Sequence, residues 1–229
     1  MPLGLAVADA VGVLDTFKKP SIPFDTVAGT SLLDAAAGKR AILDAISSVG
    51  ETSRPEDTVV VYLAGHGVAL SADEWLFAPY GADIRSTDAL RATTVSASEL
   101  QAALVKIQAR RIVLAIDACQ SATAFGPFLK QRSLYMRLLS DISRSTGNVI
   151  YAATQEEEAH ELQDLQHGVF TYALMKAVSG EALGEGAEAV IAFNVADYLE
   201  KEVPLTAQKF KIGQQDTATF ELGADFPVH

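Results

Sequence analysis

The chain has 229 residues, of which 49% are hydrophobic and 21% are charged, and this balance excludes a largely disordered protein. Its length suits one domain spanning residues 1–229, and its formal net charge of −11 argues against nucleic-acid binding, which needs clustered Lys and Arg. The sequence offers no apolar run that could span a bilayer and no basic segment of a signal peptide, so we expect a cytoplasmic protein without membrane contact.

Hydrophobic periodicity and turn residues predict a series of alternating helices and strands. Residues 3–18 have helical spacing, residues 24–29 form a weak short strand, and residues 31–49 form a second helix. Further strands are predicted at 59–65, 111–117, 148–154 and 216–222, further helices at 96–108, 133–144, 169–178 and near 194–203, and an irregular piece at 74–83. Buried strands that alternate with helices predict an α/β fold whose mostly parallel sheet is covered by helices on both faces.

Two of the predicted buried strands stop at a reactive side chain. VVVYLAG, residues 59–65, is followed by His66, and RIVLAID, residues 111–117, is followed closely by Cys119. In parallel α/β sheets the ligand crevice lies beyond the carboxyl ends of the strands. If the two strands are neighbours, His66 and Cys119 therefore project into one crevice.

These two residue types suit nucleophilic catalysis. A cysteine thiolate is a strong nucleophile, and a neighbouring imidazole assists its formation and protonates the leaving amine. The backbone N–H groups of Gly67 and Cys119 are candidates for stabilising an oxyanion. The alternative stays open, because a lone cysteine after an apolar strand is most often an inert buried residue. As the only cysteine of the chain, Cys119 forms no intramolecular disulfide, which fits a reducing compartment.

LAGHG and, about fifty residues later, DACQS resemble the His and Cys blocks of the caspase-like cysteine peptidases. LAVADA near the start, HGVFTYAL and the closing GADFPV are similar to segments of bacterial caspase-family and metacaspase-type domains. The resemblance covers nearly the whole chain. It implies a caspase-like fold and a cysteine endopeptidase in which Cys119 is the nucleophile, His66 is the general acid/base, and proteins or peptides are the substrates.

The resemblance also implies a substrate preference. Metacaspase-type members have Asp two places before the catalytic Cys and cleave after Arg or Lys, and this chain has Asp117 there. Asp9, in LAVADA, matches a second acidic position of the same pocket, so that two carboxylates would receive one basic side chain. The alternatives are a loop-capping role for Asp117 and a solvated helix carboxylate for Asp9.

Three features depart from the family pattern. Ala122 stands where Gly usually follows Cys-x-Ser, and Ala64 stands where metacaspases often have Ser. The usual first strand, which lies inside the caspase sheet, is not apparent before the first helix. We expect either a fragment of a longer protein, a strand supplied by another polypeptide segment, or a rearranged sheet.

No metal site or cofactor is predicted. Asp73, Glu74 and Asp83 could contribute oxygens to calcium, on which metacaspases commonly depend, but their spacing is unlike an EF-hand. His160 and His167 are expected in a surface loop, although HGVF resembles a family motif.

A second function class remains open, a non-catalytic caspase-like interaction module. The apparent lack of the first strand and Ala122 favour it, whereas the presence of both His66 and Cys119 counts against it.

Overall fold

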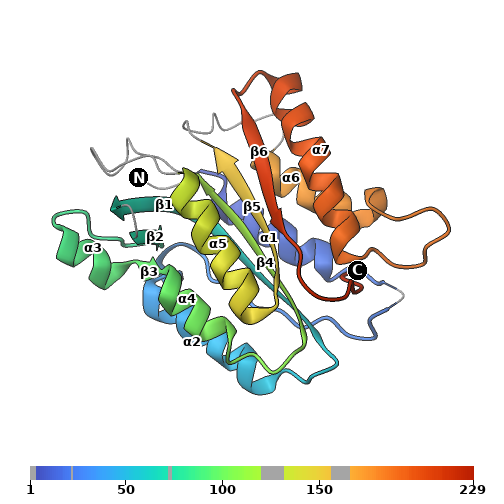
Figure 1. Cartoon of the computed structure of the whole chain (residues 1–229), viewed down its shortest axis with the longest axis horizontal. Helices are drawn as coiled ribbons and strands as arrows, with labels where there is room; N and C mark the ends of the chain where they lie inside the picture. The colour runs from blue at the N-terminus through green and yellow to red at the C-terminus, as the bar shows by residue number, and fades with distance from the viewer. Residues whose placement is uncertain (1–3, 22, 72–73, 120–131, 156–165) are drawn as a thin grey trace.

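A computed structural model describes residues 4–21, 23–71, 74–119, 132–155 and 166–229, with no side-chain placement for Cys119, Arg132, Ser133, Thr154 and Gln155 (Figure 1). The described residues form a six-stranded sheet in the order β3-β2-β1-β4-β5-β6. The strands are β1 (Thr58–Ser71), β2 (Glu74–Ala78), β3 (Val95–Ser96), β4 (Arg111–Cys119), β5 (Val149–Gln155) and β6 (Gln215–Phe220). The central strands β1, β4 and β5 are parallel, whereas β2 and β6 run antiparallel to β1 and β5.

The sheet lies between two layers of helices (Figure 1). One face packs on α1 (Ala6–Phe17), α6 (Val169–Lys176) and α7 (Ala192–Phe210), and the other packs on α2 (Lys39–Thr52), α4 (Ala97–Leu104) and α5 (Arg132–Thr146). A short helix, α3 (Thr87–Thr93), and two helical turns, η1 (Asp34–Ala36) and η2 (Ala177–Glu181), complete the described elements. The mixed α/β fold predicted from the sequence is confirmed.

Strand β4 shows why an unbroken apolar run forms the centre of this sheet. Val113 and Ala115 pack toward α1, α6 and α7, whereas Ile112, Leu114 and Ile116 pack toward the opposite helices. All five side chains are buried. A strand covered on both faces needs apolar residues at every position, so the alternation typical of a half-exposed strand is absent.

Three local predictions are wrong. Residues 24–29 do not form a strand, since Phe24 alone pairs, in an isolated bridge with Ser21. The second helix starts at Lys39 rather than at residue 31, because Gly38 has an extended backbone (ψ 162°) and serves as the N-cap. The piece predicted as irregular contains β2, whose residues Trp75 to Ala78 are all buried.

Strand β1 is longer than predicted, so His66 lies within the strand rather than after its end. The strand continues to Ser71, and its register with β2 begins at His66, opposite Ala78. The glycines beside His66 make room for aromatic rings of β2. A Cβ on Gly65 would stand 2.6 Å from the Phe77 ring, and one on Gly67 would stand 2.8 Å from Trp75 Nε1.

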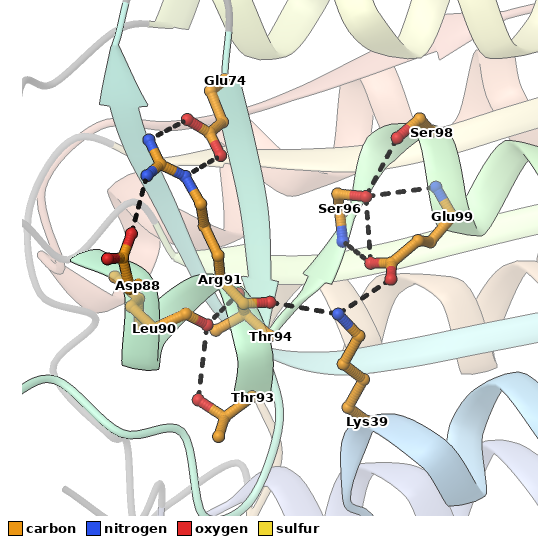
Figure 2. A network of polar contacts seen from close by, with 10 residues as sticks. All are labelled: Lys39, Glu74, Asp88, Leu90, Arg91, Thr93, Thr94, Ser96, Ser98 and Glu99. Carbon is orange, nitrogen blue, oxygen red and sulfur yellow. Dashed lines mark hydrogen bonds and ion pairs between the residues drawn. The ribbon is translucent and has the colours of Figure 1, made fainter. Parts of the chain in front are cut away.

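The β2 strand is tied to the neighbouring helices by a polar network (Figure 2). Arg91 of α3 forms two hydrogen bonds with the Glu74 carboxylate, at 2.7 and 2.8 Å, and this contact lowers the pKa of Glu74. Lys39 of α2 pairs with Glu99 of α4 at 2.8 Å and donates to the carbonyl oxygen of Arg91 at 3.1 Å. The network therefore joins α2, α3 and α4 to the strand that pairs with the His66 end of β1. β1 pairs directly with β4, so the described sheet has no open position between the strand of His66 and the strand of Cys119, and the rearranged sheet is the expectation that matches this topology. That the chain is a fragment of a longer protein stays a prediction.

The start of α4 offers a test of local stability. Ser96 accepts a hydrogen bond from the Glu99 N–H, and the Glu99 carboxylate accepts one from the Ser96 N–H, which forms a capping box. Ser96→Ala is expected to lower the free energy of unfolding by about 1 kcal/mol, measured by urea denaturation. Ser98→Ala, two residues further along the chain, keeps both hydrogen bonds of the box and is the control. Equal stability of the two variants would contradict the assignment.

Candidate active site

His66 and Cys119 lie opposite each other on neighbouring parallel strands. The β1–β4 register runs without interruption from Thr58 opposite Arg111 to His66 opposite Cys119. Neighbouring strands are separated by about 4.8 Å, so the backbones of the two residues are adjacent although 53 positions separate them in sequence. Cys119 is the last residue of β4, and Ala122 and His160 fall outside the described residues.

His66 faces the layer formed by α1, α6 and α7. Val60 and Tyr62 of β1 pack against that layer. Side chains an even number of positions apart along a strand lie on the same face, and His66 comes four residues after Tyr62. Asp117 of β4 faces the same layer, because it accepts a hydrogen bond from Thr171 of α6. Asp117 lies two residues before Cys119, which corresponds to about 6–7 Å along the strand.

Asp117 and Asp9 approach each other at the start of α6. Asp9 of α1, only 4% exposed, accepts hydrogen bonds from the Gly168 N–H at 3.1 Å and contacts His167 Nδ1 at 2.9 Å. Gly168 stands between the two carboxylates, since a Cβ there would be 3.0 Å from Asp117 Oδ2 and 3.3 Å from Asp9 Oδ2. The helix N-terminus favours this arrangement, because its N–H groups and dipole stabilise negative charge.

The carboxyl pair has unusual protonation. Burial and, to a smaller extent, the neighbouring Asp9 together raise the pKa of Asp117 to about 7, although hydrogen bonding with Thr171 lowers it. Near neutral pH Asp117 therefore carries a proton part of the time. A cation placed between the two carboxyl groups would favour the ionised form and displace that proton.

Thr171 links Asp117 to Tyr62 by a short chain of hydroxyl groups. Thr171, which is fully buried, donates to Asp117 Oδ2 at 2.6 Å. The Tyr62 hydroxyl lies 2.5 Å from Thr171 Oγ1. Because the Thr171 proton points to the carboxylate, Tyr62 is the donor to Thr171 in the ionised state. One Asp117 oxygen is thereby fixed by α6 and β1 together.

Several of these neighbours were missed in the sequence. His167 lies in a bend between β5 and α6, in keeping with the predicted loop, but its ring is partly buried against α1, where a Cβ on Gly12 would be 2.8 Å from His167 Cε1. Gly168 and Thr171 were not predicted to be site residues at all. The available signal was the HGVF motif, which includes His167 and Gly168.

The oxygen-rich residues considered for calcium are engaged elsewhere. Glu74 pairs with Arg91, and Asp83 pairs with Arg85, while Asp73 lies outside the described residues. Within the part of the chain that the structure describes, no group of three or more His, Cys, Asp or Glu could hold a metal ion.

Gly168→Ala tests how tightly the carboxyl pair is packed. Gly168 has an ordinary backbone conformation (φ −59°, ψ 149°), so the effect of a methyl group comes from contact with the two carboxylates. We expect the free energy of unfolding to fall by about 1–3 kcal/mol, as for other overpacked sites, measured by urea denaturation. The control is Gly38→Ala, since nothing lies within 4 Å of a Cβ at Gly38. A Gly168→Ala protein as stable as the control would show that the pair is loosely packed.

Comparison with known proteins agrees with the α/β architecture and identifies the class. The family model of the caspase domain, peptidase C14, matches residues 2–209, and the chain belongs to this family. The crystal structure of protein GSU0716 from Geobacter sulfurreducens is similar in fold, with a TM-score of 0.59 and 17% sequence identity over 97% of this chain and 85% of that chain. No curated protein sequence gives a significant match. Of the helices in the described residues, none is long and apolar enough to cross a membrane.

Proposed function

We propose that this caspase-family domain is a cysteine endopeptidase that cleaves proteins or peptides after Arg or Lys. The observation that carries the proposal is the register of β1 and β4. It sets His66 beside Cys119. Asp117 lies two residues before Cys119 on the same strand, and its carboxyl group and that of Asp9 both lie at Gly168. Family membership supports a peptidase of the cysteine class acting on proteins or peptides.

In the proposed reaction the Cys119 thiolate attacks the carbonyl carbon of the scissile peptide bond. The N–H groups of Gly67 and Cys119 donate to the oxyanion that forms. His66 then gives a proton to the departing amine as the C–N bond breaks, which leaves a thioester on Cys119. A water molecule that loses its proton to His66 attacks the thioester, releases the carboxylic acid and restores the thiol–imidazole pair.

In this proposal, the carboxyl pair provides the preference for a basic residue. The side chain before the scissile bond extends from the carbonyl carbon held at Cys119 back along β4 toward Asp117. A guanidinium or ammonium group there meets two carboxylates, and charge-assisted hydrogen bonds to carboxylates are among the strongest in proteins. An aspartyl side chain at that place would instead add a third negative charge.

The same residues also indicate which cofactor, cellular compartment and substrate charge to expect. All groups in the proposed reaction belong to the chain itself, so we expect no cofactor. A lone cysteine that must stay reduced fits the cytoplasm. The acidic chain, with a net charge of −11, also favours basic rather than acidic substrates.

A peptide probe that carries a thiol-reactive group after Arg tests the proposal. We expect it to label Cys119 at neutral pH at least about 100-fold faster than it labels free cysteine, because the site binds the probe beside an activated thiolate. A matched probe with Asp in place of Arg should react slowly. Labelling of both probes at the rate of free cysteine would instead support a non-catalytic interaction module. Fast labelling by the Asp probe alone would keep the dyad and overturn the pocket assignment.

A further inference from the structure

His167 lies at the junction of α1 and α6, beside the carboxyl pair. Its Nδ1 is 2.9 Å from Asp9 Oδ1, and its side chain is 21% exposed. The ring fits against α1 because Gly12 has no side chain. A Cβ at Gly12 would be 2.8 Å from His167 Cε1 and 3.3 Å from Nε2. The contact joins residues that are 158 positions apart in sequence.

The contact fixes the orientation of the Asp9 carboxylate. The Gly168 N–H is shared by both Asp9 oxygens, at 3.1 Å from Oδ1 and 3.4 Å from Oδ2, whereas His167 Nδ1 contacts Oδ1 at 2.9 Å. Asp9 Oδ2 lies on the Asp117 side, close to where a Gly168 Cβ would stand. His167 therefore holds one oxygen of Asp9 and leaves the other directed toward Asp117.

The histidine makes this contact without adding a cation. Burial lowers the pKa of His167, which favours the neutral ring at neutral pH. A neutral ring that lies 2.9 Å from an ionised carboxylate carries its proton on Nδ1 and donates it. A Lys or Arg in this position would also bind Asp9, but it would neutralise the carboxylate that a basic ligand needs.

We propose that His167 is a positioning residue of the pocket for basic side chains, which holds the Asp9 carboxylate beside Asp117 so that two carboxylates bind one guanidinium or ammonium group. The inference rests on the proposed function for its ligand class. It assigns a role to a residue outside the dyad and outside the carboxyl pair.

Two substitutions at His167 separate the hydrogen bond from the packing. His167→Asn keeps an N–H donor near the position of Nδ1, whereas His167→Leu keeps an apolar side chain against Gly12 and removes the donor. Both variants are made in a Cys119→Ala background to prevent cleavage. Binding of benzamidine, which mimics an arginine side chain, is measured by calorimetry, and thermal unfolding is recorded for each variant.

We expect His167→Leu to weaken benzamidine binding about tenfold or more, because Asp9 loses the charge-assisted hydrogen bond that orients its carboxylate. His167→Asn keeps a donor, so its affinity for benzamidine should stay within about threefold of that of the parent. Benzamidine binding by His167→Leu that is as tight as binding by the parent would overturn the inference. A parent protein that binds no benzamidine would overturn it as well. A measurement without substitution is the nitrogen NMR spectrum of His167. It should show the Nδ1–H tautomer and shift on saturation with benzamidine, and a resonance that does not move would overturn the inference.

The outcome for the proposed function is read separately, from cleavage of arginyl reporters by the protein with Cys119 intact. Cleavage that His167→Leu leaves unchanged in KM and kcat would reject the role of His167 and keep the peptidase. Benzamidine binding that depends on His167, in a protein that cleaves no reporter, would keep the pocket and reject the peptidase.

Discussion

Replacing Cys119 by alanine is expected to abolish cleavage of arginyl reporter peptides, with a loss of at least about 1,000-fold in kcat/KM. The alanine side chain has no nucleophile, and the protein holds no second cysteine that could replace it. His66→Ala should cause a loss of similar size, because the thiol then lacks its base and the leaving amine lacks its proton donor. The double variant should be no slower than Cys119→Ala alone, since residues that act as a unit are not additive.

A histidine outside the site provides the control for this series. His229 packs edge-on against Phe17 and lies 3.2 Å from the carbonyl oxygen of Lys19, away from the β1–β4 register. His229→Gln should retain cleavage within about twofold, as replacements remote from a reacting centre usually do. Unchanged cleavage by Cys119→Ala would show that Cys119 is not the nucleophile. Unchanged cleavage by His66→Ala would show that His66 is not the general acid/base, while Cys119 would keep its assignment as the nucleophile.

Asp117→Asn is expected to weaken activity and strengthen the fold at the same time. Without its charge the pocket loses one of the two carboxylates, and we expect kcat/KM for arginyl reporters to fall about 100-fold or more. Stability should change in the opposite direction. Burial and Asp9 raise the pKa of Asp117 from 3.8 to about 7, so the native state holds the Asp117 proton more tightly than the unfolded chain does.

The pH window for this stability effect follows from the sign of the shift. Between pH 3.8 and about 7 the folded protein binds the Asp117 proton and the unfolded protein does not, so this group reduces stability as the pH rises. The penalty is complete above about pH 7 and absent below pH 3.8. An Asn is neutral throughout, so Asp117→Asn should be more stable than the parent at pH 8 by an amount of the order of 4 kcal/mol, and equally stable near pH 4.

Urea denaturation at the two pH values measures this difference. Asp15→Asn is the matched control, because Asp15 is an exposed carboxylate on α1, the helix that carries Asp9. The control should show no gain that appears only at pH 8. A less stable Asp117→Asn protein at pH 8 would mean that the ionised Asp117 is a favourable partner of Thr171 rather than a strained member of a carboxyl pair.

The fold could be predicted from the sequence where a single local pattern determines an element. β4 was recognised because burial on both faces leaves an unbroken apolar run, and the same pattern located the first part of β1. β2 was missed because it is only five residues long and is followed at once by Pro79 and a turn, which resembles an irregular segment. The extension of β1 beyond His66 depends on pairing with β2, so it could not be predicted once β2 was missed.

The site could be predicted only in part, for a similar reason. Asp117 and Asp9 were predicted as pocket residues through a resemblance, and the structure brings both to Gly168. The positions of His167 and Thr171 depend on how α6 docks against α1 and β4. Those contacts join residues 158 and 54 positions apart, and no local pattern in the sequence encodes them.

The most direct test of the account is a cleavage profile against a library of peptides, read by mass spectrometry, for the protein beside its Cys119→Ala variant. The account predicts cuts after Arg and Lys by the unaltered protein and no cuts by the variant. Cuts that persist in Cys119→Ala, cuts after Asp, or a library left intact by both proteins would contradict it.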